Sequence, residues 1–211
     1  GHGGTIFHFD GRRWHWQTQG IEEDFHAVWG SGPDDVYAVG SGGVIYHYDG
    51  SRWTSQASGT NDLLWAVWGS SSSDIFACGR GDVILHSDGS TWRIMSPAVS
   101  GMRNGLSGIW GSGPNDVYAV GPGLVLHYDG SRWTRSSDSE GGYDIWGSGS
   151  DDVYLLGSGD RIFHFDGTSW SEQNSGFEID IDDHLHGIWG SGPENVFVVG
   201  DRGTILHRGG Q

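Results

Sequence analysis

The feature that most constrains this chain is an internal repeat. The stretch Trp29–Thr54 returns almost letter for letter at Trp110–Thr134, and weaker copies start at Trp68, Trp146 and Trp189. The W-G-S tripeptides that open these copies recur at intervals of about 40 residues, a period typical of repeat architectures. Because repeats report architecture, we expect function to lie where the copies disagree.

Within one copy the pattern predicts four short strands and no helix. The first three are His26–Gly30, Val36–Val39 and Val44–Tyr48, which carry β-branched and aromatic residues. Turn signals rich in Gly, Pro, Ser and Asp separate them, and an Asp-Gly hairpin precedes the fourth strand, Arg52–Ser55. We name these strands A to D. A period near forty with strand and turn signals alone is the mark of a β-propeller blade.

Counting strands predicts how the ring closes. Strands A, B and D each occur five times and strand C six times, and the chain opens on C and D and ends on A, B and C. We therefore expect one all-β domain over residues 1–211, a five-bladed propeller of four-stranded antiparallel blades, closed between the N- and C-terminal strands. One C strand, Gly3–Phe9 or Gly203–His207, is then surplus. It is expected to be frayed, added at an edge or lent to a neighbouring molecule, and a cut from a longer array is the alternative. The predicted repeat units are 3–24, 25–63, 64–106, 107–142, 143–185 and 186–207.

Charge and composition exclude several classes of function. The formal net charge of −16 argues against binding to nucleic acid, whose phosphates require a basic surface, and suits cationic ligands or metal ions. No apolar stretch approaches the roughly 20 residues that span a bilayer. Cys78 is the only cysteine, so no internal disulfide can form, and its repeat position predicts a small buried hydrophobe.

Two short motifs carry a family resemblance. The segments Asp49–Trp53 (D-G-S-R-W) and Ser87–Trp92 (S-D-G-S-T-W) resemble the Asp-box turn of sialidase-type BNR repeats in bacterial β-propeller proteins. That box normally has one residue between Asp and Gly, which are adjacent here. The resemblance implies a propeller fold, and because such families include lectins, scaffolds and glycosidases it leaves function open.

A histidine recurs in every copy of strand C, represented by His47. Copies in separate blades cannot converge on one ion, so we expect each to be structural. The predicted role is a hydrogen bond within the blade, with Asp49, Ser31 or a turn amide as its partner.

The loops divide into a uniform set and a variable set. The A–B and C–D turns are nearly identical in all copies, whereas the D–A connections and B–C turns differ in length and chemistry. In an antiparallel blade these two sets lie at opposite ends. Binding residues concentrate on variable loops over a rigid frame, so the variable end is the predicted binding face. Drift in unconstrained loops is the alternative.

One ring of residues on this face is specific. It lies three residues before each W-G-S tryptophan, where strand A begins, and should surround the mouth of the central channel. Asp144 is the only acid within a strand A, and its alternative role is to cap a turn. The predicted ligand-binding residues are His26, Trp65, Arg80, Ser107, Tyr143, Asp144, His186 and Arg202.

The last D–A connection is acidic. Asp180, Asp182 and Asp183 offer oxygen ligands suited to calcium, and the adjacent His184 or His186 would suit zinc or manganese. Plain solvation of an acidic loop is the alternative. A divalent cation, calcium first, is thus the only cofactor predicted.

These observations favour a non-enzymatic recognition module. No G-x-S-x-G, H-E-x-x-H or phosphate-binding loop is present. The leading ligand class is a glycan, because Trp65 and Tyr143 offer aromatic platforms beside Asp144. A protein-interaction or structural propeller is the alternative, and a glycoside hydrolase comes third. We expect a secreted or cell-surface bacterial protein that is monomeric, with strand exchange between molecules as a second state.

Overall fold

A computed structural model describes residues 1–18, 21–81, 83–95, 105–136, 140–173 and 184–209. The chain divides into two compact units, Gly1–Ser96 and Pro97–Gln211, and each is described by itself. Short 3-10 turns occur at η1 (His2–Gly4), η2 (Ser41–Gly43) and η3 (Asp201–Gly203), and every other element is a strand. No helix within the described residues is long and apolar enough to cross a membrane.

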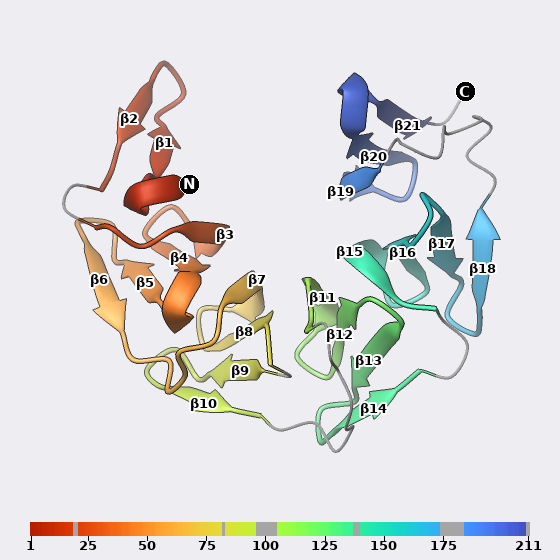
Figure 1. Cartoon of the computed structure of the whole chain (residues 1–211), viewed down its shortest axis with the longest axis horizontal. Coiled ribbons are helices and arrows are strands. Elements are labelled where there is room, and N and C mark those ends of the chain that lie inside the picture. The colour runs from red at the N-terminus through yellow and green to blue at the C-terminus, as the bar shows by residue number, and fades with distance from the viewer. Residues whose placement is uncertain (19–20, 82, 96–104, 137–139, 174–183, 210–211) are drawn as a thin grey trace. The chain divides into compact units, whose positions relative to one another are not determined.

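The first unit contains a hairpin and two four-stranded sheets (Figure 1). Its strands are β1 (Phe7–Phe9), β2 (Trp14–Trp16), β3 (Phe25–Gly32), β4 (Asp35–Gly40), β5 (Ile45–Tyr48), β6 (Trp53–Gln56), β7 (Leu64–Ser71), β8 (Asp74–Gly79), β9 (Ile84–Ser87) and β10 (Trp92–Ile94). Strands β1 and β2 pair with each other, β3 to β6 form one sheet in chain order, and β7 to β10 form the next.

The second unit contains two four-stranded sheets and one three-stranded sheet. Its strands are β11 (Gly108–Gly113), β12 (Asp116–Gly121), β13 (Leu124–Tyr128), β14 (Trp133–Arg135), β15 (Gly142–Gly149), β16 (Asp152–Gly157), β17 (Ile162–Phe165), β18 (Trp170–Gln173), β19 (Leu185–Gly192), β20 (Asn195–Gly200) and β21 (Ile205–Gly209). All pairs are antiparallel and consecutive, so the predicted order A to D within each copy is confirmed.

The core of each unit lies between neighbouring sheets. In the first unit Tyr37, Val39 and Ile45 of one sheet pack against Leu64 and Val67 of the next, and all five side chains are at most 8% exposed. The second unit repeats this packing in two clusters. Strand alternation therefore sends one set of apolar residues from each sheet into the interface with its neighbour.

The W-G-S tripeptide has a packing reason. A Cβ atom built on Gly69 would lie 2.6 Å from Cη2 of Trp29, which is part of the preceding sheet. The equivalent pairs in the second unit are Gly147 with Trp110 and Gly190 with Trp146, each with the same 2.6 Å approach. Each of these three tryptophans thus rests on the glycine of the next copy, and a larger residue there would displace the indole.

The recurring histidine bonds to a different partner from the one predicted. His47 Nε2 lies 2.7 Å from Oδ1 of Asp35, whose Oδ2 accepts a hydrogen bond from Ser31 Oγ. The expected contact to Asp49 was wrong because Asp35, at the start of β4, lies closer across the β4–β5 ladder. The arrangement recurs in Ser70–Asp74–His86, Ser112–Asp116–His127 and Ser148–Asp152–His164. In the last copy Asn195 replaces the aspartate, its Oδ1 contacts His207, and its Nδ2 donates to Ser191 Oγ.

The Asp-Gly turns are built as the sequence predicts. Asp49 Oδ1 accepts hydrogen bonds from Ser51 Oγ at 2.6 Å and from the backbone N–H groups of Ser51 and Arg52, both at 2.9 Å. The Ser51 hydroxyl and these two amides lower the pKa of Asp49 to about 2. Gly50 has a φ of 88°, a conformation that favours glycine and explains why it follows every such aspartate. Cys78 is fully buried, as predicted, and burial raises the pKa of its thiol.

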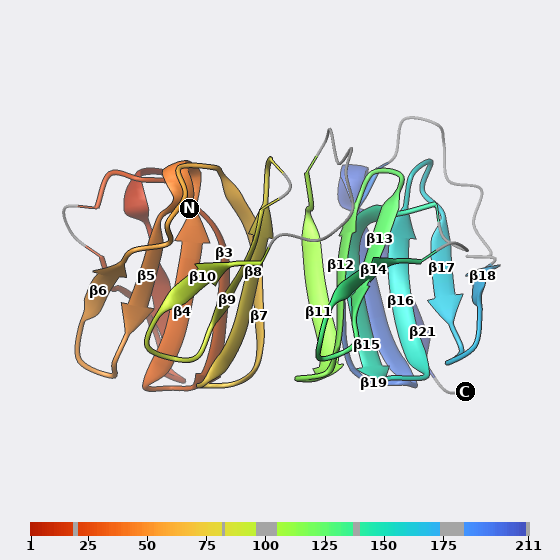
Figure 2. The same cartoon turned by 90° about the horizontal axis from the view of Figure 1, so that it is seen from below.

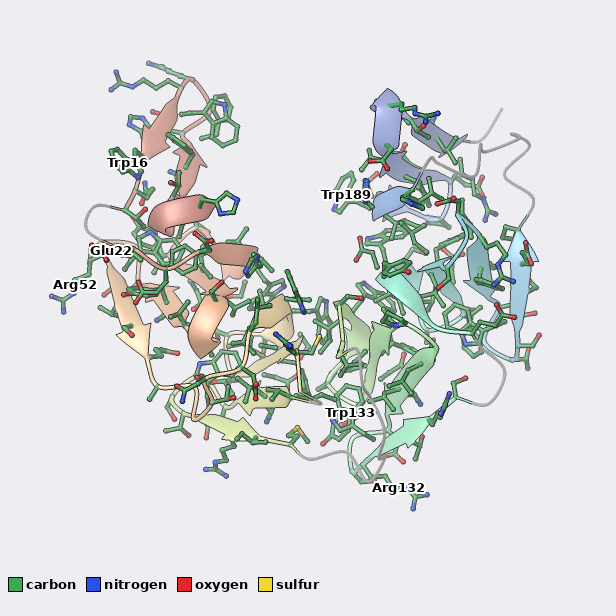
Figure 3. The ribbon with its side chains drawn as sticks, viewed as in Figure 1. Trp16, Glu22, Arg52, Arg132, Trp133 and Trp189 are labelled. Atoms are coloured by element: carbon green, nitrogen blue, oxygen red, sulfur yellow. The ribbon has the colours of Figure 1, made fainter. Side chains whose placement is uncertain are left out.

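The first and last repeats remain incomplete sheets. The hairpin β1–β2 supplies strands C and D, whereas β19–β21 supplies A, B and C, so both candidates for the surplus strand are formed. Trp189 is 60% exposed, and Figure 3 shows its ring projecting away from β19. Val28 on β3 is 62% exposed, whereas its equivalents Val67 and Ile145 are 8% and 4% exposed. Blade number and closure between the terminal strands stay predictions.

Candidate functional site

Antiparallel pairing separates the uniform and variable loops within each unit. The turns between β3 and β4 and between β5 and β6 lie at one end of their sheet, and the turn between β4 and β5 lies at the other (Figure 2). At the uniform end the recurring polar side chains pair with one another, as Ser31, Asp35 and His47 do. We therefore expect the side chains that bind a ligand to lie at the variable end.

In the first unit the variable end brings together His26, Trp65 and Ser41. The imidazole of His26 packs against the Trp65 indole with ring centroids 4.7 Å apart, and its Nε2 lies 3.1 Å from Ser41 Oγ. Burial lowers the pKa of His26. Trp65 is 42% exposed, so its indole offers a partly open aromatic surface. Arg80, the third predicted residue of this unit, is exposed.

A polar hollow of about 420 Å3 also opens at this end of the first unit. Its walls are the η2 turn, the end of β6 and the connection that follows it, and they consist of backbone and uncharged side chains. Ser58 Oγ donates to the Thr60 carbonyl at 3.1 Å, so this connection is held by its own hydrogen bonds. The lining offers no charged or aromatic group.

A more chemically diverse hollow opens at the variable end of the second unit. It holds about 320 Å3 and is lined by Tyr143, Gly159, Asp160, His184, Leu185 and His186. We call it the Tyr143 hollow. Tyr143 and His186 belong to the predicted ligand-binding set, and Tyr143 is 46% exposed.

Two carboxylates fix the histidines beside this hollow. His186 Nε2 lies 2.6 Å from Oδ1 of Asp201, and the backbone N–H of His184 donates to Oδ2 of the same residue at 3.3 Å. The His186 contact and the His184 amide hold the pKa of Asp201 below its usual range. Asp160 Oδ1 accepts a hydrogen bond from the backbone N–H of Leu185 at 3.1 Å and lies 3.6 Å from His184 Nδ1.

Two other predicted residues are engaged inside the protein. Asp144 Oδ1 accepts from the backbone N–H of Ile145, and Oδ2 accepts from that of Ile188, both at 2.9 Å. Ser107 Oγ donates to the carbonyls of Gly142 at 3.4 Å and Val120 at 3.5 Å. These contacts favour the capping alternative for Asp144, with the difference that it reaches across to a neighbouring sheet rather than closing its own turn.

Sequence reasoning missed Asp160 and Asp201 as members of the site. Asp160 has a φ of 61° and Arg202 a φ of 54°, and they are the two non-glycine residues with positive φ among those described. The equivalents of these two in the B–C turn of the first full copy are Gly43 and Gly42, at 72° and 65°. At the Asp160 position the aligned repeats carry glycine at Gly43 and Gly203 and aspartate at Asp82, so a side chain at a position where some copies have glycine was a signal available in the sequence.

The predicted metal ligands Asp180, Asp182 and Asp183 lie outside the described residues. Within the part of the chain that is described, no group of three or more His, Cys, Asp or Glu side chains could hold a metal ion. The acidic connection therefore stays a prediction, and what the structure describes at the Tyr143 hollow is a set of paired imidazoles and carboxylates.

Similarity to known proteins is confined to structure. No protein-family model matches the chain, and no curated protein matches its sequence. Among solved structures it is similar to YCF48 bound to D1 peptide, with a TM-score of 0.72, 16% identity and coverage of 98% of this chain and 72% of that one. It is also similar to Chaetomium thermophilum Sqt1 bound to the N-terminus of the ribosomal protein L10, with a TM-score of 0.70, 14% identity and coverage of 98% and 65%. A third similar structure, AFV00434, is described as an ancestral GH74 enzyme, with a TM-score of 0.63, 16% identity and coverage of 88% and 31%.

These similarities establish a repeat β-propeller fold. At such low identity they establish the fold alone, and the Asp-box resemblance gains no support from them. Two of the three similar structures are described as bound to a peptide or to a protein segment, and the third as an enzyme. The chain is thus an all-β propeller repeat protein.

Proposed function

We propose that this protein is a non-enzymatic recognition module that binds a peptide segment of a protein partner through its variable end. The observation that carries the proposal is the Tyr143 hollow, which gathers an aromatic ring, two imidazoles and a carboxylate at loops and strand ends that differ between copies. The uniform end instead closes its polar side chains into Ser–Asp–His contacts. A rigid repeated frame that presents individual loops is the usual basis of a binding site.

Two further observations favour a peptide over other ligands. The structures of YCF48 and Sqt1 hold a peptide and a protein N-terminus, so this fold supports such binding in those proteins. In this chain the hollow is small, at about 320 Å3, and suits one or two side chains of an extended segment. The remaining affinity would come from neighbouring loops, as in other peptide complexes that use a few anchor side chains.

A glycan, which the sequence analysis ranked first, is the second candidate here. Trp65 and Tyr143 are 42% and 46% exposed, so each offers an aromatic surface for a sugar ring. Each belongs to a different copy, and the corresponding positions carry other residues, which favours individual contacts over equivalent lectin sites in every blade. The predicted set His26, Arg80, Ser107, Asp144, His186 and Arg202 stays part of this proposal.

One experiment separates these candidates. A displayed library of random peptides and a glycan array are screened with the wild type and with a Trp65→Ala, Tyr143→Ala double variant. The proposal predicts selected peptides whose binding falls in the variant. Glycan binding lost in the variant would favour the second candidate, and turnover of a glycoside substrate would overturn both.

Several finer features belong to the same proposal. We place the site on a closed five-bladed ring, because Trp189 and Val28 are the exposed counterparts of residues that neighbouring sheets cover elsewhere. A secreted or surface location in a bacterium, and a monomeric state with strand exchange as a second state, complete it. Calcium at Asp180, Asp182 and Asp183 is proposed as an additional ligand, and calorimetry with the wild type and an Asp182→Asn variant tests it.

A further inference from the structure

We propose that the Tyr143 hollow binds a cationic side chain, the ammonium of lysine or the guanidinium of arginine, in the peptide partner. This inference rests on the proposed function and adds the chemical class of its anchor residue. It concerns a site within the second unit alone, formed by residues that follow β16 and by the start of β15 and β19.

Asp160 supplies the negative charge of the proposed site. Its side chain is 11% exposed, whereas His184 beside it is 65% exposed. Oδ1 accepts the Leu185 amide at 3.1 Å, which orients the carboxylate within the lining of the hollow. A carboxylate held in place and largely shielded from water interacts with an opposite charge more strongly than one on an open surface.

The charged groups around the Tyr143 hollow leave its electrostatic potential negative. Asp201 lies beside it and pairs with His186, and the pKa of Asp201 is lowered, so this carboxylate is ionised at neutral pH. Arg161 follows Asp160 in the chain, but its guanidinium contacts Glu140 and Glu172. Arg202 follows Asp201 and is exposed. The chain as a whole carries a formal charge of −16, which steers cationic ligands toward it.

Tyr143 makes the hollow suited to a long cationic side chain rather than to a bare ion. Its ring is 46% exposed and forms part of the lining. An aromatic face packs against the methylene stem of lysine or arginine and attracts the cation through its quadrupole. Leu185 adds an apolar surface to the same lining. A carboxylate, an aromatic ring and an apolar wall in one concavity match the three parts of such a side chain.

The backbone conformation at Asp160 restricts which residues fit at this position. Its φ of 61° lies in the left-handed region, and the corresponding residue in the first full copy is Gly43. Aspartate and asparagine tolerate this conformation better than other side chains, at a small energetic cost. The copy thus places a carboxylate where Gly43 has no side chain, next to His184, the last residue of the variable connection between β18 and β19.

The test uses small probes on the whole chain. Nα-acetyl-arginine amide and Nα-acetyl-lysine amide are titrated while the imidazole Cε1–H signals of His184 and His186 are followed by NMR, with His→Gln variants assigning them. Uncharged Nα-acetyl-norleucine amide is the matched probe. We expect both cationic probes to shift these signals in a saturable way and the norleucine probe to bind at least about tenfold more weakly.

Two variants localise the effect. Asp160→Asn removes the charge but keeps a residue that tolerates positive φ, and it should weaken the cationic probes by about tenfold or more. Glu194→Gln makes the same charge change in the same unit, in the A–B turn at the uniform end, and should leave binding unchanged within about twofold because its charge is exposed and screened.

Each outcome bears on the inference. Equal binding of arginine, lysine and norleucine probes, or equal loss in both variants, would overturn it. The absence of a saturable shift with every probe up to millimolar concentrations would also overturn it. Peptides selected in the display experiment that bind through Tyr143 but carry no basic residue would leave the proposed function intact while refuting the cationic anchor.

Discussion

The Asp144 carboxylate accepts a hydrogen bond from the backbone N–H of Ile188 at 2.9 Å, and this bond joins strand β15 to strand β19. We expect Asp144→Ala to lower the free energy of unfolding by about 1–3 kcal/mol, because it leaves two amides without their acceptor. Urea denaturation measures this, with the exposed Glu194→Ala as control. An unchanged midpoint would contradict the role of Asp144 as a brace between sheets.

The same residue predicts a dependence of stability on pH. Burial raises the pKa of Asp144, against the opposing effect of its two amide bonds. Because the pKa of Asp144 is higher in the folded state than in the unfolded state, its contribution to stability is largest at low pH. That contribution is lost as the pH rises through the folded pKa. The stability of the wild type relative to Asp144→Asn should therefore decrease upward from about pH 4. Urea melts of both proteins between pH 4 and 7 check this, and a difference that grows with pH would refute it.

The recurring histidine is predicted to act on stability and not on binding. His47→Ala removes both the contact to Asp35 and the stack on Tyr37, whose ring centroid lies 4.4 Å away. The expected loss is about 1–3 kcal/mol, with peptide binding unchanged. A double-mutant cycle with Asp35→Ala measures how much of the loss comes from the pair. Weaker binding at an unchanged melting temperature would show that His47 contacts a ligand.

The aspartates of the Asp-Gly turns make the stability of the fold depend on pH in the opposite direction to Asp144. The pKa of Asp49 is lowered from 3.8 to about 2, chiefly by the Ser51 hydroxyl and then by the amides of Arg52 and Ser51. A lowered folded pKa stabilises the folded state above the unfolded pKa, and this contribution is lost as pH falls through the folded value. Carboxyl 13C NMR should give a midpoint of about 2 for Asp49. Ser51→Ala should move it upward, and a midpoint near 3.8 in the wild type would refute the turn geometry.

Much of the fold was predictable because it repeats. The order of strands A to D follows from alternation and turn residues, and four complete copies show the same order. The partner of His47 was not predictable in this way. Asp35 and Asp49 are both close in sequence and both recur in other copies. Only the register of β4 against β5, which pairs Tyr37 with His47, brings Asp35 diagonally within reach of the imidazole.

The candidate site was predictable only in part. Tyr143 and His186 were predicted because they lie at the start of strand A, at a position that varies between copies. Asp160 was missed because it belongs to the preceding copy, and its contact with Leu185 joins residues 25 positions apart. The chemistry of such a site depends on how adjacent sheets stack, which a repeat pattern read one copy at a time does not contain.

Trp189 tests the closed arrangement. Trp146 rests on Gly190 of the following sheet, whereas Trp189 is 60% exposed and its sheet lacks a fourth strand. If the ring closes, Trp189→Ala should destabilise the protein about as much as Trp146→Ala, by about 3–5 kcal/mol. Thermal denaturation of both variants at several protein concentrations measures this. A neutral Trp189→Ala beside a damaging Trp146→Ala would show that no sheet covers the indole.

The central claim is that recognition resides at the variable end, and one binding comparison tests it most directly. A peptide selected by the wild type from a displayed library is titrated by calorimetry against three proteins: the wild type, a Tyr143→Ala, Asp160→Asn variant, and a uniform-end variant, Asp34→Asn, Glu194→Gln. The account predicts that the first variant binds at least about tenfold more weakly and that the second binds like the wild type. Equal affinity in all three, or loss confined to the uniform-end variant, would contradict it.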